Sequence, residues 1–323
     1  MKIRSSTIFR IITSIVVVIL LLSLYYYGTH GKDQAEPKAI SLIVYGNETE
    51  RWENLRRGAD QAAEAAGAEV NLVTMSDETD AGEQKKLIQR EINNGADALM
   101  IAACNSTEMK QYIEELSGKI PVILVESGIG YTDDRLCISA DHYQMGYQLG
   151  ETIIEHEVPE VKVAIFIDHE LRDSVAERYQ GLYDALQGRV DSITIWNRKD
   201  NEADIRAMLL LQRQLTEEAV DVVVGLDTAS TEAVIDAAEN LNKDVKLYGI
   251  GNSDQTVYYL DSGVVEALGY QNEFSIGYLG VCEVMGISHH TREEYNNMVE
   301  YRVVTKKSLY ETDNQKMLFP FVK

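Results

Sequence analysis

Cysteine, proline and positive charge are scarce in this sequence, and each scarcity excludes a class of protein. The three cysteines, Cys104, Cys137 and Cys282, are scattered and odd in number, so they make no CxxC pair, no zinc spacing and no disulfide framework. No segment rich in proline, glycine and serine divides the chain, so two independent domains on a flexible linker are not expected. The net charge of -22 argues against binding to nucleic acid, because phosphate binding requires a basic surface.

The usual catalytic sequences are absent as well. There is no GxSxG, HExxH or P-loop sequence. His289 and His290 are adjacent rather than four residues apart, which does not suit two metal ligands on one helix. Glu126 and Asp227 could be imagined as the acid pair of a glycosidase, but a ligand-binding role needs no such tuning of two carboxyl groups. The sequence therefore predicts a protein that is not an enzyme, with no catalytic residues, no metal site and no cofactor.

A hydrophobic segment close to the amino terminus is the clearest feature that is present. Residues 11–28 are uncharged and dominated by isoleucine, valine and leucine, and their number is near the lower limit of the roughly 17–25 residues needed to span a bilayer. Basic residues within 1–10 favour a cytoplasmic amino terminus, with the remainder of the chain outside. The sequence thus predicts a cytoplasmic basic segment (1–10), one transmembrane helix (11–28) and a polar linker (29–37).

A cleaved signal peptide is the alternative explanation of the hydrophobic segment. The sequence around its end, YYYGTHGK, lacks the small-x-small pattern of a cleavage site. No cysteine lies at the end of the segment, so a lipid-modified lipoprotein is not expected either. We therefore favour an uncleaved anchor, which makes this a single-pass protein of the cell membrane with its large domain extracellular or periplasmic.

The rest of the chain alternates short apolar runs with amphipathic helical patterns. Residues 40–44 are rich in β-branched residues and predict a buried parallel strand, and the apolar spacing within 55–66 predicts a helix that Gly67 ends. Further strands are predicted at 70–74, 98–102, 121–125, 137–140, 161–167, 192–196, 220–225, 245–249, 264–268 and 299–304, with helices between most of them. This alternation predicts parallel sheets. The number of strands favours two interwoven α/β lobes over a single small sheet.

The first strand and helix also mark a candidate site. Ligands in such sheets sit beyond the carboxyl ends of the strands, and the turn after residues 40–44 occupies that position. Trp52 lies in the first turn of the following helix and so at the mouth of the possible site. Packing of Trp52 in the core is an equally good explanation of this residue on its own.

Several segments follow one another in a distinctive order and spacing. They are LRRGADQAAEAAG at 55–67, NNGADALMIAAC at 93–104, IPVILVE at 120–126, ISADHYQMGYQLGE at 138–151, AERYQGLYDAL at 176–186, DVVVGLDTASTEAV at 221–234 and KLYGIGNSDQTVYYLDSGVVEALGYQNEFSIGYLG at 246–280. From about Lys38 to Arg302 the chain resembles the type I periplasmic binding proteins. The likeness is to the ribose- and galactose-type sugar-binding branch, whose lobes are shared with the LacI-type repressors.

This resemblance implies two Rossmann-like lobes with parallel sheets, joined by three hinge crossings near residues 140–142, 270–272 and 301–304. The first lobe would comprise residues 38–140 and about 272–301, and the second lobe residues 141–271 and about 302–323, including the tail. The resemblance further implies that the lobes close around a sugar in the cleft between them. Ligand contacts from both sides would favour the closed state.

The resemblance also implies ligand-binding roles at the positions that match. Trp52 stands where the family has an aromatic ring that packs on the apolar face of a sugar, and Glu126 stands where it usually has an aspartate that accepts hydroxyl hydrogen bonds. Asp227 matches an acid that follows a later strand, Gln271 a hinge glutamine, and Asp141 the acid of the first crossing. Ionised carboxylates suit this task because they form short, strong bonds to hydroxyl donors.

Other positions depart from the sugar-binding pattern. Ala176, Leu226 and Gly251 stand where the ribose-binding branch has arginine, asparagine and aspartate, and Ala102 replaces a polar residue. Several standard sugar contacts are therefore missing, and ribose itself is not the expected ligand. The residues expected to compensate for them, or to complete the predicted ligand-binding set, are Arg172, Asn252, Asn105, Asn47 and Arg51.

The predicted function is that of a membrane-anchored solute-binding protein for a carbohydrate or a similar small polar ligand, which it delivers to an ABC-type permease. The alternative is a sensor domain that presents its ligand-bound form to a membrane histidine kinase or chemoreceptor. The missing lipid-anchor cysteine and the missing sugar contacts favour this alternative. A repressor is not expected, because the sequence has no helix-turn-helix, has a hydrophobic amino-terminal segment and is acidic.

Overall fold

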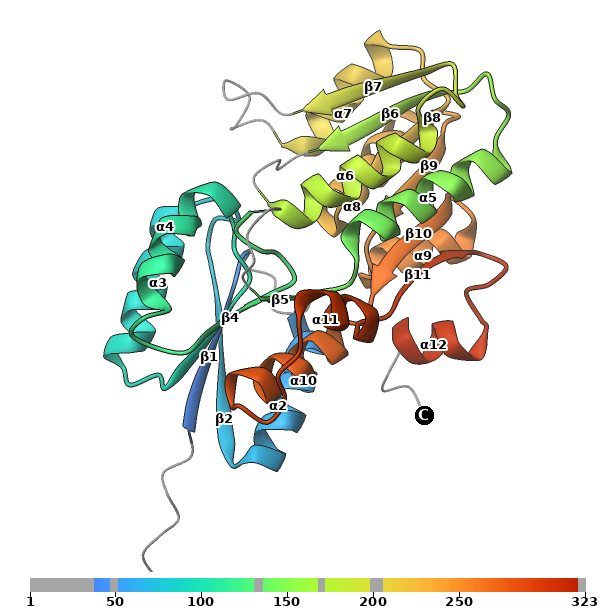
Figure 1. Ribbon diagram of the computed structural model, residues 1–323. Helices are drawn as coiled ribbons and strands as arrows, with labels where there is room; N and C mark the ends of the chain where they lie inside the picture. Colours follow the sequence, from blue (N-terminus) through green and yellow to red (C-terminus); the bar gives the residue numbers. More distant parts are fainter. Residues whose placement is uncertain (1–37, 47–51, 131–135, 168–171, 198–205, 319–323) are drawn as a thin grey trace, which may run out of the picture. The chain divides into compact units, whose positions relative to one another are not determined.

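The computed structural model describes residues 38–46, 52–130, 136–167, 172–197 and 206–318 (Figure 1). Residues Ala39–Lys323 form one compact unit, distinct from Met1–Lys38. The predicted basic segment (1–10), transmembrane helix (11–28) and linker (29–37) lie outside the described residues. Within the part of the chain that is described, no helix is both long and apolar enough to cross a membrane.

The first of two sheets has five strands in the order β2-β1-β3-β4-β5. They are β1 (Lys38–Val44), β2 (Ala68–Thr74), β3 (Ala98–Ile101), β4 (Val122–Val125) and β5 (Cys137–Ile138). The pairs β1–β3, β3–β4 and β4–β5 are parallel. The helices of this lobe are α2 (Glu53–Ala66), α3 (Ala81–Asn93), α4 (Ser106–Leu116) and α10 (Glu273–Val284). Helices α3 and α4 cover one face of the sheet, and α2 and α10 pack together on the other (Figure 1).

The second sheet has six strands in the order β11-β10-β9-β8-β6-β7. They are β6 (Lys162–Ile167), β7 (Ser192–Asn197), β8 (Val222–Gly225), β9 (Lys246–Ile250), β10 (Val265–Gln271) and β11 (Tyr301–Thr305). The helices of this lobe are α5 (His142–His156), α6 (Asp173–Leu186), α7 (Ala207–Glu217), α8 (Thr228–Leu241) and α9 (Asp254–Ser262), followed after β11 by the short α12 (Thr312–Leu318). The predicted α/β fold with two mainly parallel lobes is therefore confirmed.

One strand corrects the expectation of purely parallel sheets. β11 pairs with β10 in antiparallel fashion, with Gln271 opposite Tyr301. The reason lies in the path of the chain, which leaves the second sheet at the end of β10, passes through α10 and α11 (Arg292–Met298), and returns. Because the chain re-enters beside the residue at which it left, the returning strand runs back along β10.

The chain passes between the two sheets three times. The passages are residues 139–141 between β5 and α5, Asn272 between β10 and α10, and residues 299–300 between α11 and β11. Two of them are bonded to each other, because the amide of Asn272 donates to the carbonyl of Glu300 at 2.8 Å. The Gln271 side chain, next to the second passage, accepts from the amide of Ala140 in the first at 3.4 Å.

Both sheets are buried because helices cover both of their faces. All residues of β3 and β8 are buried, as expected for short apolar strands covered on two sides. The helix pairs on one face of each sheet approach each other at glycine. A Cβ atom at Gly277 of α10 would lie 1.9 Å from the Leu55 carbonyl oxygen of α2, and one at Gly181 of α6 would lie 2.0 Å from that of Tyr143 in α5. Only glycine permits these two backbone contacts.

Polar caps begin most of the helices that follow strands. In each case the cap side chain accepts a hydrogen bond from the backbone amide three residues later, which satisfies one of the free donors of the first turn. These caps are Asp80, Asn105, Asp141, Asp227, Ser253 and Asn272. Since these helices start near the carboxyl ends of strands, the same residues lie near the edge where ligands bind in such sheets.

Candidate ligand-binding site

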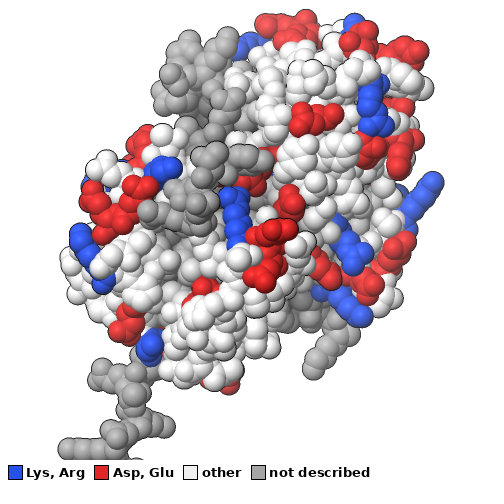
Figure 2. Space-filling view, viewed as in Figure 1, with Lys and Arg blue, Asp and Glu red and all other residues white. Residues whose placement is uncertain are grey.

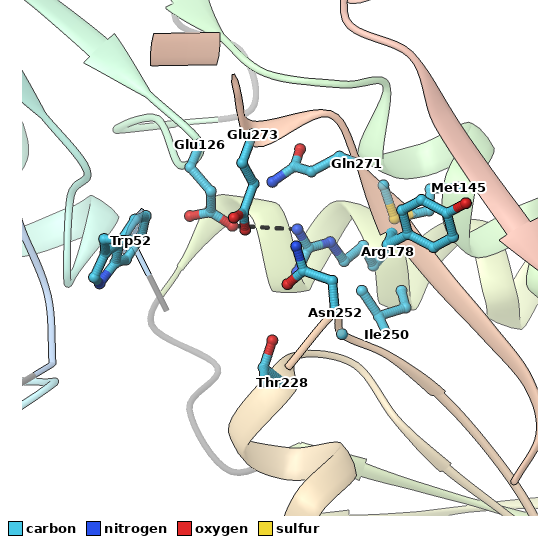
Figure 3. Close-up of a pocket in the computed structure, with 11 residues that line it drawn as sticks. Trp52, Glu126, Met145, Arg178, Thr228, Ile250, Asn252, Gln271 and Glu273 are labelled. Atoms are coloured by element: carbon cyan, nitrogen blue, oxygen red, sulfur yellow. Dashed lines mark hydrogen bonds and ion pairs between the residues drawn. The ribbon is translucent and has the colours of Figure 1, made fainter. Parts of the chain in front are cut away.

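A small cavity lies between the two lobes at the carboxyl ends of their strands (Figure 3). Its volume is about 30 Å³, which is room for roughly two water molecules. The lining residues are Trp52, Glu126, Met145, Arg178, Thr228, Ile250, Gly251, Asn252, Tyr270, Gln271 and Glu273. The cavity therefore combines one indole, two carboxyl groups, one guanidinium and two amides with an apolar wall.

Glu126 is the acceptor on the side of the first lobe. It follows β4 directly, is 4% exposed and has a left-handed backbone with φ of 62°. Its carboxylate accepts from the Tyr45 hydroxyl at 2.5 Å and from Nη2 of Arg178 at 3.2 Å. Burial by itself raises the pKa of Glu126, but Arg178 and the Tyr45 hydrogen bond help to outweigh burial and hold that pKa below its ordinary value. The group is thus an ionised acceptor at neutral pH and not a proton donor.

Arg178 is the donor on the side of the second lobe. It projects from α6, is 4% exposed and points toward Glu126 (Figure 3). Its guanidinium also donates to the Leu226 carbonyl and to Nδ1 of His142, both at 3.2 Å. These two bonds stay within the second lobe and hold the arginine in place, while the bond to Glu126 crosses to the first lobe.

His142 completes this group, and its tautomer follows from its partners. Burial, together with the nearby Arg178, lowers the pKa of His142 to about 3, so the imidazole is neutral at pH 7. Because Arg178 can only donate, Nδ1 must accept. The proton is therefore on Nε2, which donates to the backbone carbonyl of Glu126 at 2.8 Å.

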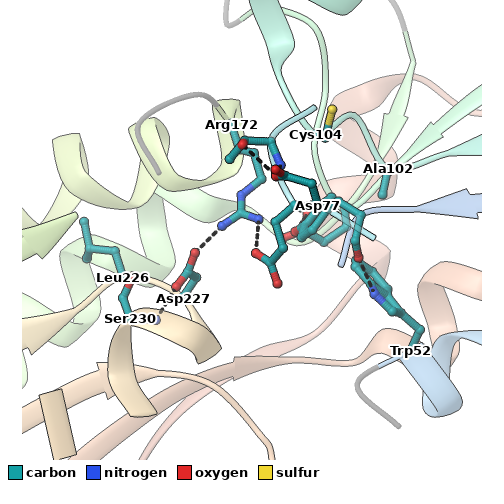
Figure 4. A network of polar contacts seen from close by, with 12 residues as sticks. Trp52, Asp77, Ala102, Cys104, Arg172, Leu226, Asp227 and Ser230 are labelled. Carbon is teal, nitrogen blue, oxygen red and sulfur yellow. Dashed lines mark hydrogen bonds and ion pairs between the residues drawn. The ribbon is translucent and has the colours of Figure 1, made fainter. Parts of the chain in front are cut away.

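A second buried arginine lies beside the cavity, in the network of Figure 4. Arg172 is 1% exposed and forms ion pairs with Asp227 of its own lobe and with Glu78 of the first lobe, the latter at 3.3 Å. Its guanidinium also lies 4.3 Å from the centre of the Tyr45 ring, a cation–π contact. Asp227 in turn accepts from the Ser230 amide at 2.7 Å as the cap of α8. Arg172 and Asp227 are therefore engaged with each other and are not among the lining residues.

Trp52 both lines the cavity and packs in the core of the first lobe. Its side chain is 1% exposed, and its indole nitrogen donates to the Tyr45 carbonyl at 2.9 Å. The Trp52 and Tyr45 rings meet edge to face with centroids 5.0 Å apart, a favourable geometry for aromatic pairs. Trp52 is thus both a core residue and a wall of the cavity, and its contact with a ligand stays a prediction.

The structure brings together four of the nine predicted ligand-binding residues. Trp52, Glu126, Asn252 and Gln271 line the cavity. Asp141 does not, because its carboxylate caps α5 by accepting from the Gln144 amide at 2.9 Å. Asp227 and Arg172 lie beside the cavity in their own ion pair, and Asn47 and Arg51 lie outside the described residues.

Sequence reasoning missed Arg178, which is the main cation of the cavity. The resemblance directed attention to Ala176, two positions earlier, which on a helix points to a different side. The sequence does hold a signal for Arg178. It lies three residues before Gly181 and four after Ser174, on the face of α6 that packs toward α5 and the cleft, and an arginine on the buried face of a helix requires an acidic partner.

The chemistry of the site fits a neutral or polar ligand. A buried ionised carboxylate accepts hydroxyl hydrogen bonds, amides both donate and accept, and an indole face packs on C–H groups. Within the described ranges, no group of three or more His, Cys, Asp or Glu residues is placed to hold a metal ion. Acidic side chains are spread over the face shown in Figure 2 more widely than basic ones, in keeping with the net charge of -22.

The comparison with known families gives the class of this protein. The sequence model of the periplasmic binding protein domain family matches residues 40–285. The chain therefore belongs to the periplasmic binding protein domain family. No curated protein matches the sequence significantly.

Solved structures of this class share the fold. A glucose–galactose binding protein from Geobacillus stearothermophilus is 19% identical, with a TM-score of 0.73 and coverage of 85% of this chain and 99% of that one. A solute-binding protein of Agrobacterium vitis with bound D-fucose is 16% identical, with a TM-score of 0.76 and coverage of 87% and 100%. The XylFII–LytSN complex contains a chain that is 19% identical, with a TM-score of 0.70 and coverage of 84% and 98%. The predicted resemblance to type I periplasmic binding proteins is thus confirmed.

Proposed function

We propose that this protein is an extracellular or periplasmic solute-binding protein for a carbohydrate or a similar small polyhydroxylated ligand, and that it delivers the ligand to an ABC-type importer. The observation that carries the proposal is a buried, ionised carboxylate beside an indole, both facing a cavity between two lobes that three chain passages join. This arrangement is suited to binding, not to proton transfer, because the low pKa of Glu126 makes it a poor acid. The solved structures with a similar fold include a glucose–galactose binding protein and a solute-binding protein with bound D-fucose.

In this proposal each cavity residue has a separate role. The Trp52 ring packs against the apolar face of the ligand, and Glu126 accepts from its hydroxyl groups. The amides of Gln271 and Asn252 bond to the remaining hydroxyl groups. Asp227 and Arg172 reach the ligand only by exchanging their present partners for it. The predicted roles of Asp141, Asn47 and Arg51 remain part of the proposal.

The proposed location of the protein follows from the amino-terminal sequence. Residues 11–28 would anchor the chain in the cell membrane, with residues 1–10 in the cytoplasm and both lobes outside. The linker of residues 29–37 then reaches roughly 30 Å when extended. Such a tether keeps the lobes within reach of a membrane partner.

A second candidate function is sensing, in which the domain presents its ligand-bound form to a membrane histidine kinase or chemoreceptor. The favouring observation is that one similar structure is a complex, XylFII with LytSN. The tether suits this role as well as delivery to a permease. Co-purification of the full chain from its own membranes separates the two roles, since one predicts a permease and the other a kinase or receptor as the partner.

A thermal-shift screen tests the binding function directly. The compact unit Ala39–Lys323 is heated with a panel of hexoses, pentoses, cyclitols and amines, each at millimolar concentration. The proposal predicts that at least one sugar or cyclitol raises the melting temperature by several degrees, because a ligand that binds only the folded state stabilises it. Stabilisation by amines alone, or by none of the compounds, would contradict it.

A further inference from the structure

The cavity is too small for the ligand that its residues suit. A volume of about 30 Å³ holds roughly two water molecules. A pyranose has about twelve non-hydrogen atoms, several times what two water molecules occupy. Figure 3 shows what fills the space instead, since Arg178 extends across it toward Glu126, with Asn252 and Gln271 on either side. The two lobes are therefore closed on each other around a side chain of the protein.

One helix end makes most of the polar contacts that join the lobes beside the cavity. Arg172 and the first turns of α6 belong to the second lobe, and they form six bonds to the first lobe or to α11, which packs against β5. The bonds are Arg172 to Glu78 at 3.3 Å, the Asp173 amide to the Ser106 hydroxyl at 2.9 Å, the Gly130 amide to the Asp173 carboxylate, the Ser174 amide to the Ser127 hydroxyl at 3.4 Å, Arg292 to Glu177 at 2.6 Å and Arg178 to Glu126 at 3.2 Å. We call these six contacts the α6 latch.

Contacts within the second lobe hold α6 and the Arg178 side chain in place. Helix α6 approaches α5 so closely that a Cβ at Gly146 would lie 2.0 Å from the Arg178 carbonyl oxygen. The Arg178 side chain is held by His142 and by the Leu226 carbonyl, both within its own lobe. Little side-chain entropy is therefore lost when Arg178 bonds to Glu126, because two of its three bonds already exist.

We propose that the α6 latch closes the lobes in the absence of ligand, with the Arg178 guanidinium occupying the Glu126 carboxylate that a polyhydroxylated ligand would use. The class of ligand in this proposal rests on the proposed function, whereas the closure of the lobes does not. The ligand binds after the latch opens, and it exchanges a hydroxyl donor for the guanidinium at Glu126. The apparent affinity is reduced by the fraction of molecules that are latched. Weakening the latch away from the cavity therefore tightens ligand binding.

The test measures the distance between the lobes in the ligand-free full chain, reconstituted in lipid nanodiscs. Spin labels are placed at Thr107→Cys on α4 and Gln187→Cys at the end of α6, both exposed, while the three native cysteines are buried. The wild type is compared with Arg178→Gln and with Arg292→Gln. Arg292 is not among the residues that line the cavity. The matched control is Arg189→Gln, whose ion pair with Glu151 joins α5 and the end of α6 within the second lobe.

The expected result is one short distance for the wild type and for Arg189→Gln. Arg178→Gln and Arg292→Gln should each shift molecules to a longer distance, with the closed-to-open ratio falling roughly tenfold or more for Arg178→Gln, since it breaks a buried charge pair. A long distance in the ligand-free wild type, or variants with unchanged distances, would overturn the proposal. If Arg178→Gln fails to fold, the distance between the lobes in Arg292→Gln tests the proposal by itself.

Because this measurement uses no ligand, its result does not depend on whether the protein binds a sugar. Once a ligand is known from the thermal-shift screen, Arg292→Gln should bind it severalfold more tightly than the wild type. Weaker binding by Arg292→Gln would mean that the latch assists the ligand and does not compete with it, which would overturn the exchange at Glu126.

Discussion

The two lobes are built alike, yet they bring opposite charges to the cleft. Each has a mainly parallel sheet with a glycine-packed helix pair on one face, α2 with α10 in the first lobe and α5 with α6 in the second. The first lobe presents the acceptors Glu78 and Glu126, and the second presents the donors Arg172 and Arg178. The comparison teaches that the shared scaffold sets where helices end, while the residues at those ends decide how the lobes interact.

The largest expected effect comes from unbalancing this charge pairing. Glu126→Gln leaves Arg178 buried without its acidic partner, and breaking such a buried pair costs about 3–5 kcal/mol. Urea unfolding at pH 7 measures the loss. The matched control is Glu151→Gln, which breaks the exposed pair with Arg189 and should cost much less, because solvent screens such pairs. Equal losses for the two variants would show that the buried pair in the cleft contributes no more to stability than an exposed pair.

The glycine contacts that the two lobes share give the next largest effect. Gly181→Ala in the second lobe and Gly277→Ala in the first each place a Cβ within 2.0 Å of a backbone oxygen. Each should lower the free energy of unfolding by about 3 kcal/mol, because packed helices cannot separate without cost. Gly118→Ala is the control, since its Cβ would meet no atom within 4 Å. If one of the two variants keeps its stability, the helix pairs of the two lobes are not packed equally tightly.

A pH titration of stability tests the neutral histidine at the boundary of the lobes. Burial lowers the pKa of His142 to about 3 in the folded protein, against about 6.5 when unfolded. A base with a depressed folded-state pKa contributes stability that is complete above the unfolded pKa and is lost as pH falls toward the folded one. The free energy of unfolding should thus fall by about 2 kcal/mol between pH 8 and pH 5.

The matched variants isolate this contribution. His142→Gln should remove about 2 kcal/mol from the pH dependence, whereas His156→Gln, at an exposed position on the same helix, should leave it unchanged. Glu126 acts at lower pH, because its depressed pKa supplies stability that is lost only as the pH falls through that low value. An unchanged slope in His142→Gln would mean that folding does not lower the pKa of this imidazole.

The smallest expected effect distinguishes the two tryptophans, one in each lobe. Trp52→Phe loses the indole hydrogen bond to Tyr45 and part of the ring that faces the cavity. We expect ligand binding to weaken about tenfold, or about 1.4 kcal/mol. Trp196→Phe changes a ring buried in the core of the second lobe and should leave the affinity unchanged. Calorimetric titration of both variants with the same sugar makes the comparison, and equal affinities would remove Trp52 from the site.

The sequence predicted the elements well because their signals are local. The apolar run of residues 220–225 and the alanine-rich helix after it are readable from spacing alone, and both exist in the structure as β8 and α8. The direction of β11 was not readable, because it depends on where the chain re-enters the sheet. That is a property of the whole path and not of residues 299–304.

The site was predicted only in part for a related reason. Trp52 was predicted from its position after the first strand and Glu126 from the family resemblance, and both line the cavity. Asp141 and Asp227 also follow strands, but their carboxylates cap helices, and a cap and a ligand-binding acid look identical in sequence. Arg178 escaped prediction because its role depends on Glu126, a partner 52 positions away in the other lobe.

The most direct test of ligand binding between the lobes is a fluorescence titration of Trp52 alone. In the Trp196→Phe variant, Trp52 is the only tryptophan left, because the chain has two. We expect that a sugar or cyclitol changes its emission in a saturable way, and that adding Glu126→Gln to the same variant abolishes the change. Emission that no such compound alters, or that responds equally with and without the Glu126 carboxylate, would contradict binding of a polyhydroxylated ligand in the cavity.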